Sequence, residues 1–191
     1  MNHLEQIVGE WYEYTGYFVR RNVLVGKRLK GGYDGELDIV AFNPKTKHLV
    51  HIEPSLDADS WDRREERFKK KFDLGKKYIP KLFSGIQMPE KIEQIALFVF
   101  GSNDNHKTVG GGVVATVAEF YSVVAAGLGG KRIAKSAVPE QYALLRTVQH
   151  CLEYSQAMSS AVSSNNVFQS TLRSGGTRQL SGSRVSGLRH I

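Results

Sequence analysis

Two short apolar runs joined by a turn-forming segment limit the fold of this chain more than any other feature of its sequence. The runs cover residues 36–42 and 48–53, and residues 43–47 between them contain asparagine, proline and threonine. Apolar runs of this length on either side of a turn are typical of a β-hairpin. We therefore expect a hairpin in which Leu49 faces Phe42.

Each run carries a carboxylate near the end far from the turn, Asp38 in the first and Glu53 in the second. If His51 faces Val40, Glu53 stands opposite Asp38 on the same face of the sheet, with Cβ atoms about 4.5–5.5 Å apart. Two carboxylates this close repel each other unless one takes up a proton or both hold a cation. Because Mg²⁺ takes oxygen ligands of this kind, the hairpin is the predicted place for chemistry. His51 shares this face and is expected to be a packing residue.

Composition limits the class of protein. The 191 residues are 41% hydrophobic and 24% charged, which is typical of one soluble domain with a sizeable core. No apolar run approaches the ~18 residues that a membrane span needs, and residues 1–5 lack the layout of a secretory signal. The single cysteine, Cys151, excludes an internal disulfide framework. These features predict a cytoplasmic protein with no membrane partner.

The formal net charge of +7 is unevenly distributed. No acid follows Glu153, and residues 156–191 are rich in serine and arginine, which predicts a flexible basic tail after a folded domain at residues 1–155. Within the domain, cations gather at residues 20–30 and again at residues 63–81. Such clusters are compatible with polyanion binding, although an ordinary solvated surface has the same composition.

The other segments predict an α/β protein. Residues 2–15 have the apolar spacing of a helix, and residues 17–25 form a β-rich run. A long helix follows candidate caps at residues 57–60 and ends at Pro80, with a buried stripe at Trp61, Phe68, Phe72 and Gly75. The rest of the chain is predicted as a buried strand at 95–100, a loop at 103–112, a strand and a helix at 113–128, and a last helix at 139–154 with Pro139 in its first turn.

The order of these elements and three local matches carry a resemblance to a known family. The matches are Gly16-Tyr17-Phe18-Val19-Arg20-Arg21, Glu36-Leu37-Asp38-Ile39-Val40-Ala41 and Leu49-Val50-His51-Ile52-Glu53. Over residues 3–101 the chain resembles the PD-(D/E)XK nuclease superfamily of restriction enzymes, DNA-repair nucleases and Holliday-junction resolvases. The resemblance implies a restriction-endonuclease-like fold, with a mixed β-sheet core flanked by helices, and a DNA endonuclease activity.

The resemblance also implies roles for particular residues. Asp38 matches the metal-binding aspartate, Glu53 the second metal ligand, and the carbonyl of Pro54 the group that completes the coordination sphere. Glu5, or less well Glu10, matches the glutamate that some members carry on the first helix. In such enzymes Mg²⁺ or Mn²⁺ polarises the scissile phosphate and lowers the pKa of the attacking water.

The chain departs from the family at Ser55, where the motif has a lysine. A serine hydroxyl carries no charge, so it cannot orient the attacking water or offset transition-state charge as an ammonium does. Three explanations stay open. A cation of the following helix replaces the lysine, with Arg64, Lys69 and Lys70 as candidates; the metal alone suffices; or the domain has lost catalysis and keeps only nucleic-acid binding or a scaffolding role.

DNA is the partner that the resemblance implies. The cations expected to contact it are Arg20, Arg21, Lys30 and Arg64. Many nucleases of this fold cut both strands as dimers, so a homodimer is also an expectation of the resemblance, although the sequence identifies no dimer surface.

Overall fold

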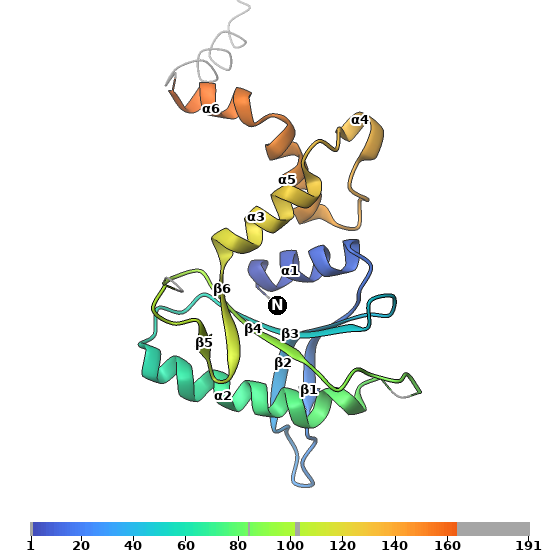
Figure 1. The fold of residues 1–191 in the computed structure, drawn as a ribbon, viewed down its shortest axis with the longest axis vertical. Helices are drawn as coiled ribbons and strands as arrows, with labels where there is room; N and C mark the ends of the chain where they lie inside the picture. Colours follow the sequence, from blue (N-terminus) through green and yellow to red (C-terminus); the bar gives the residue numbers. More distant parts are fainter. Residues whose placement is uncertain (1, 84, 102–103, 164–191) are drawn as a thin grey trace, which may run out of the picture. The chain divides into compact units, whose positions relative to one another are not determined.

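The computed structural model describes residues 2–83, 85–101 and 104–163 (Figure 1). The chain divides into two compact units, residues 1–153 and 154–191, which are described separately. In the second unit the described part is Tyr154 and helix α6 (Ser155–Ser163), so a helix stands where the start of a flexible tail was expected. The rest of the predicted tail, residues 164–191, lies outside the described residues.

The first unit is built on one six-stranded sheet with the strand order β1-β2-β3-β4-β6-β5. Strands β1 to β3 are antiparallel, β3, β4 and β6 run parallel, and β5 is antiparallel to β6. The chain is therefore an α/β protein with a mixed sheet, as predicted. The strands are β1 (Phe18–Val25), β2 (Gly35–Asn43), β3 (His48–Ser55), β4 (Glu93–Phe98), β5 (Thr108–Val109) and β6 (Gly112–Thr116).

The predicted hairpin and its register are confirmed. Phe42 pairs with Leu49 and Val40 with His51. Asn43 fixes the turn, because its side-chain Oδ1 accepts hydrogen bonds from the backbone amides of Lys45 and Thr46 at 3.0 and 3.2 Å. Such local bonds are the reason that asparagine is favoured in turns.

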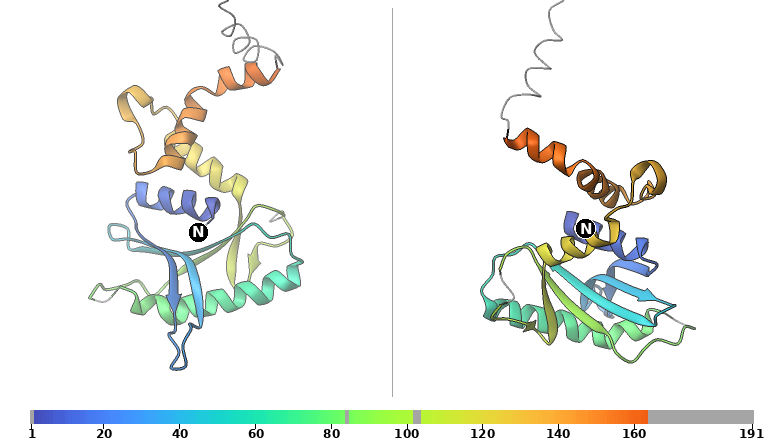
Figure 2. Two further views of the ribbon diagram at one scale, coloured as in Figure 1. Left: turned by 180° about the vertical axis from the view of Figure 1, so that it is seen from behind. Right: turned by 45° about the horizontal axis from the view of Figure 1, so that its top comes forward.

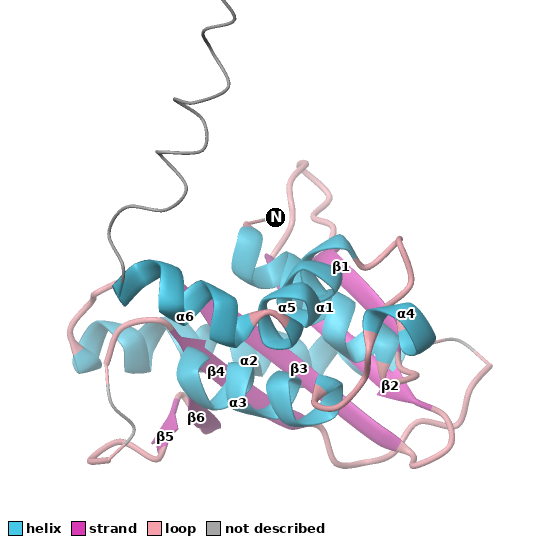
Figure 3. Ribbon diagram, turned by 90° about the horizontal axis from the view of Figure 1, so that it is seen from above, coloured by secondary structure: helices cyan, strands magenta, loops and turns pink. Residues whose placement is uncertain are grey.

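Helices cover both faces of the sheet (Figures 2 and 3). One face, here called the three-helix face, packs against α1 (His3–Tyr14), α3 (Val117–Leu128) and α5 (Ala143–Glu153). Its buried residues include Ile7, Val124 and Leu145 from these helices. The short helix α4 (Ile133–Ser136) adjoins α5.

Helix α2 (Trp61–Tyr78) covers the opposite face, here called the α2 face, and runs into a 3-10 turn at Ile79–Lys81 that contains Pro80. Phe68 and Phe72 of this helix are buried against the sheet, as predicted. Burial of a phenylalanine side chain contributes about 1.5–3 kcal/mol. Within the described residues, no helix combines the length and the apolar character needed to cross a membrane.

Two predicted boundaries differ from the structure. Strand β5 lies inside the segment expected to be a loop, and the last helix of the first unit begins at Ala143 instead of near Pro139. The first backbone amides of α5 find a partner far away in the sequence. Oε2 of the buried Glu10 accepts hydrogen bonds from the amides of Leu144 and Leu145 at 2.9 and 3.0 Å. A side chain of α1 thus satisfies donors at the start of α5, which otherwise have no partner within the helix.

Candidate functional site

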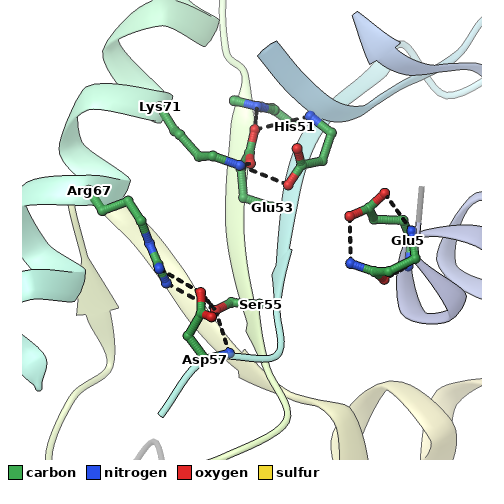
Figure 4. A network of polar contacts seen from close by, with 9 residues as sticks. Glu5, His51, Glu53, Ser55, Asp57, Arg67 and Lys71 are labelled. Atoms are coloured by element: carbon green, nitrogen blue, oxygen red, sulfur yellow. Dashed lines mark hydrogen bonds and ion pairs between the residues drawn. The ribbon is translucent and has the colours of Figure 1, made fainter. Parts of the chain in front are cut away.

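Three elements bring two carboxylates and one ammonium group together on the α2 face. Asp38 comes from β2, Glu53 from β3 and Lys71 from α2. Nζ of Lys71 lies 2.8 Å from Oδ2 of Asp38. The same Nζ also contacts Oε2 of Glu53 (Figure 4). The two carboxylates are thus close enough to share a single cation, as the hairpin register predicts.

The regular alternation of side chains between the two faces of β2 is interrupted at Asp38. Leu37 packs in the core on the α2 face, whereas Ile39 packs on the three-helix face, although residues two apart in a regular strand share a face. Arg21 pairs with Ile39 and Val23 with Leu37, so Asn22 of β1 stands opposite Asp38. Asn22 has a φ of 50°, in the left-handed region that few residues other than glycine adopt. The change of face in both strands coincides with the residue that supplies the carboxylate.

Glu53 is held from several sides although its side chain is only 1% exposed. Oε1 accepts hydrogen bonds from the backbone amide of Asp38 at 3.2 Å and from Nε2 of His51 at 2.7 Å, while Oε2 contacts Lys71. Burial of an isolated carboxylate is costly, so a buried one requires partners of this kind. Glu53 therefore has a fixed position before any ligand binds.

A chain of hydrogen bonds fixes the protonation state of His51. Nε2 of Gln94 donates to the carbonyl of Phe72 at 2.8 Å and to Nδ1 of His51 at 3.3 Å. Since Nδ1 accepts, Nε2 carries the proton and donates it to Glu53, which as a carboxylate can only accept. Burial, together with the positive charge of Lys71, lowers the pKa of His51 to about 3. His51 is thus a neutral donor that positions Glu53, a more specific role than the packing role expected.

The charged groups at the site shift one another's pKa values. Burial and the neighbouring Glu53 carboxylate raise the pKa of Asp38 to about 7, with Lys71 acting in the opposite direction. For Lys71, burial favours the neutral amine, but the carboxylates of Glu53 and Asp38 outweigh it and raise the pKa of the ammonium. Near neutral pH the site holds one permanent cation and an aspartate close to its titration point.

A second polar group lies beside the carboxylates, at the position where the family motif has lysine. Ser55 is buried, and its hydroxyl accepts a hydrogen bond from Nη2 of Arg67 at 3.0 Å. Nη1 of Arg67 also binds Asp57 and Asp59, at 2.5 and 3.0 Å. Arg67 and Lys71 stand one helical turn apart on α2, so positive charge adjoins both Ser55 and the carboxylate pair (Figure 4).

Two pockets open beside these groups. The larger, with a volume of about 340 Å³, is lined by Asp38, Arg67, Lys70 and Lys71 together with residues 34–36 and Leu74. The smaller, of about 100 Å³, is lined by Pro54, Ser55, Asp57, Arg67, Phe68 and Lys71. Because Arg67 and Lys71 line both pockets, a ligand in either one would meet their positive charge.

The structure identifies Lys71, and neither Lys69 nor Lys70, as the cation at the carboxylates. The ammonium of Lys69 faces Asp73 at 4.0 Å, and its side chain is 68% exposed. Lys70 is exposed and lines the larger pocket. The helical period could have found Lys71, because it stands three residues after Phe68 and four before Gly75, within the buried stripe of α2.

The predicted helical glutamate lies elsewhere. Glu5 forms a capping box with Asn2, in which Oε2 accepts from the Asn2 amide at 3.1 Å and Oδ1 of Asn2 accepts from the Glu5 amide at 2.9 Å. Figure 4 draws Glu5 as a group separate from the contacts of His51, Glu53 and Lys71. A capping box satisfies donors at a helix start, which is a structural role.

The four residues predicted to contact DNA differ in their exposure and in the partners that they already have. Arg64 is 3% exposed, donates to the carbonyls of Asp57 and Phe100, and stacks on Phe98, so the structure contradicts a surface role for it. Arg21 packs on α1 with an ion pair to Glu13 at 2.9 Å. Arg20 is exposed and donates to a backbone carbonyl, and Lys30 is exposed in the loop between β1 and β2.

The donor set suits magnesium only in part. Within the described ranges, there is no group of three or more histidine, cysteine, aspartate or glutamate side chains that could hold a metal ion. Mg²⁺ nevertheless often binds proteins through one or two carboxylates and keeps several waters. The carbonyl of Pro54 is a further oxygen on this side: the carbonyl of Ser55 accepts from the amide of Val99, the residue directly after β4, at 3.2 Å, and successive carbonyls of a strand point in opposite directions. The Pro54 carbonyl therefore points toward β2, which carries Asp38.

No protein-family model matches this chain, and comparisons with curated proteins and with solved structures found no match either.

Proposed function

We propose that this chain is a metal-dependent phosphodiesterase that cleaves DNA, with a fold of the restriction-endonuclease type. The observation that carries the proposal is the convergence of Asp38 and Glu53, from adjacent strands, on the ammonium of Lys71. Paired carboxylates with a neighbouring cation are the groups that metal-assisted phosphodiester hydrolysis needs, and the pockets beside them leave room for a substrate phosphate.

Each residue has a separate task in this proposal. Asp38, Glu53 and the Pro54 carbonyl would hold Mg²⁺ or Mn²⁺, which supplies Lewis-acid polarisation of the phosphate and a lowered pKa for a bound water. Lys71 stays protonated because its pKa is raised, so it acts as a fixed positive charge that stabilises the negative charge developing on the phosphate. His51 keeps the Glu53 carboxylate in place.

Lys71 would also replace the lysine that the family motif carries where this chain has Ser55. An ammonium delivered from α2 reaches the same pair of carboxylates from the helix side, and Ser55 is then free to bind Arg67. The replacement supports the first of the three explanations for the missing lysine, with Lys71 in the place of Lys69 or Lys70.

The test is cleavage of plasmid and linear duplex DNA by the purified full-length chain with Mg²⁺ or Mn²⁺. We expect cleavage that is removed by EDTA and by Asp38→Asn or Glu53→Gln, each of which keeps the side-chain shape. Asp73→Asn is the matched control. It changes an exposed carboxylate of α2, and this protein should cleave normally. Activity that survives both Asp38→Asn and Glu53→Gln would come from a contaminant and would refute the proposal.

One observation favours a second function, a nuclease-like domain without catalysis that binds nucleic acid or serves as a scaffold. Lys71 already bridges the two carboxylates, so a divalent ion must compete with an ammonium that neutralises the pair. On this alternative, the protein retains DNA in a salt-dependent way and no divalent metal induces cleavage. It also predicts that Mg²⁺ leaves the melting temperature unchanged, whereas a metal-binding site raises it.

A further inference from the structure

A pocket at the other end of β3 gathers three lysines from three separate segments. It has a volume of about 480 Å³, and its lining includes Lys47 of the β2–β3 turn, Lys76 of α2 and Lys91 before β4. All three lysines are exposed. Like charges around a concave surface raise the local positive potential and attract anions.

The lysine charges are only weakly compensated. Lys76 has Asp73 at 3.8 Å, a pair in which both side chains are more than half exposed, and such surface pairs contribute little. For Lys47 and Lys91, the described residues include no ion-pair partner. One carboxylate, that of Glu93, also lines the pocket, and Nε2 of His48 engages it at 2.6 Å. The pocket thus carries three cations against one bound carboxylate.

Two of these lysines have local features that place them at the pocket. Lys47 has a φ of 54° in the turn, a left-handed conformation that places its side chain differently from that of an ordinary strand residue. A Cβ added to Gly111, which also lines the pocket, would lie 3.9 Å from Nζ of Lys76. The ammonium of Lys76 therefore faces the pocket wall.

The pocket and the carboxylate site lie toward opposite ends of β3. Glu53 is five positions after His48 in this strand, a distance of roughly 17 Å, or about five base-pair steps of a DNA duplex. On α2, Lys76 follows Lys71 by five residues, or roughly 140° around the helix axis, so the two side chains leave the helix in different directions. Gln94 lines the pocket and also donates to His51, the residue that holds Glu53.

We propose that this pocket binds a phosphate group of the nucleic-acid backbone, several nucleotides away from the phosphate at Asp38 and Glu53. The assignment rests on the proposed function, because the identity of the polymer comes from the carboxylate site. A free phosphate compound has the same chemistry as a backbone phosphate, so the experiment has to separate these two sources.

The first arm titrates inorganic phosphate into the ¹⁵N-labelled full-length protein in the absence of divalent metal. We expect amide shifts in residues 47–49, 91–94 and 111–113, and their loss in a Lys47→Gln/Lys91→Gln double variant. The matched control is Arg132→Gln/Lys135→Gln, which removes two charges at α4 and should keep the shifts. If no shifts occur in the pocket of the wild-type protein, the anion site is refuted.

The second arm measures binding of a labelled duplex in EDTA at several salt concentrations. Loss of the one phosphate held in this pocket should reduce the slope of log K against log salt by about 0.9 in Lys47→Gln/Lys91→Gln, and the control variant should keep the wild-type slope. If both double variants behave alike, the pocket proposal is wrong while the proposed function can still be shown by cleavage. If phosphate shifts the pocket amides but the wild-type protein does not bind the duplex, the ligand is a small phosphate compound and the backbone assignment fails, while cleavage with Mg²⁺ or Mn²⁺ decides the proposed function separately.

Discussion

The Nζ atom of Lys71 lies 2.8 Å from Oδ2 of Asp38, and the same ammonium contacts Glu53. One residue of α2 therefore links two strands of the sheet through their charged groups, 33 and 18 residues earlier in the chain. This contact affects both stability and the proposed function. The ammonium that neutralises the charge of the buried carboxylates is also the group proposed to stabilise the reacting phosphate.

Substitution of Lys71 tests both roles. Lys71→Gln should lower the DNA cleavage rate by roughly 10²–10³-fold, the usual effect of removing one group that stabilises transition-state charge. It should also lower the free energy of unfolding by about 3 kcal/mol, near the low end for breaking a buried ion pair, since Lys71 is 31% exposed. Urea denaturation and initial rates measure the two effects.

Lys69→Gln is the matched control, because it removes the same charge from an exposed position of α2 that lines neither pocket beside the carboxylates. It should leave both the stability and the rate close to wild type. An active Lys71→Gln protein would show that another group, or the metal alone, supplies the missing charge.

Much of the site could be predicted because it depends on local patterns. The turn at residues 43–47 and the alternation of each apolar run fix which residues face each other, and the register of Phe42 with Leu49 is confirmed. Once that register is known, the meeting of Asp38 and Glu53 follows from strand geometry.

The remaining features depend on contacts between distant segments. The change of face at Asp38 is accompanied by a left-handed Asn22 on another strand, and no pattern in either run signals it. Arg64 looked like a surface cation, yet it is buried between the carbonyls of Asp57 and Phe100. The start of α5 depends on Glu10, more than 130 residues away.

The pKa of Asp38 predicts how stability depends on pH. Its value of about 7 in the folded protein exceeds the unfolded value of roughly 3.9, so the folded state binds the additional proton between these values. Stability therefore falls as the pH rises through this window. His51 has the opposite sign: its folded pKa of about 3 lies below the unfolded value of roughly 6.5, so its contribution increases with pH and is nearly complete by pH ~6.5.

Above that point the Asp38 contribution is the larger of the two that still change. Between pH 6.5 and pH 8 it should lower the free energy of unfolding by about 0.8 kcal/mol, whereas the remaining titration of His51 in the unfolded chain raises it by about 0.4 kcal/mol. Asp38→Asn should remove that fall, whereas Asp73→Asn should keep it. Urea denaturation of the three proteins at both pH values measures the difference, and an unchanged slope in Asp38→Asn would assign the dependence to another group.

The protonation state of His51 depends on Gln94. In the wild-type protein, ¹⁵N NMR should show the neutral tautomer with the proton on Nε2 from pH 8 down to pH 5. Gln94→Glu places a carboxylate, which can only accept a hydrogen bond, next to Nδ1. His51 should then take up a second proton at neutral pH and lie as a cation between two carboxylates.

Gln94→Met is the control for this change, since it removes the hydrogen bond without adding charge and should leave the ring neutral. If His51 stays neutral in the Gln94→Glu protein, the hydrogen-bond chain from Gln94 to Glu53 does not set its state.

The close approach of α2 to the sheet depends on Gly75. A Cβ at this position would lie 2.4 Å from Nδ1 of His51 and 3.1 Å from Nε2 of Gln94, so Gly75→Ala cannot be accommodated without movement of the helix or the imidazole. In an unobstructed helix, alanine would be about 1 kcal/mol more stable than glycine. Here we expect the free energy of unfolding to fall by roughly 1–3 kcal/mol, the usual cost of overpacking a core. We also expect reduced cleavage, because His51 no longer holds Glu53.

Urea denaturation and initial rates measure the two effects of Gly75→Ala. The control is Lys77→Ala, at an exposed position near the end of the same helix. A Gly75→Ala protein as stable and as active as wild type would mean that the contact between α2 and His51 does not position the carboxylate.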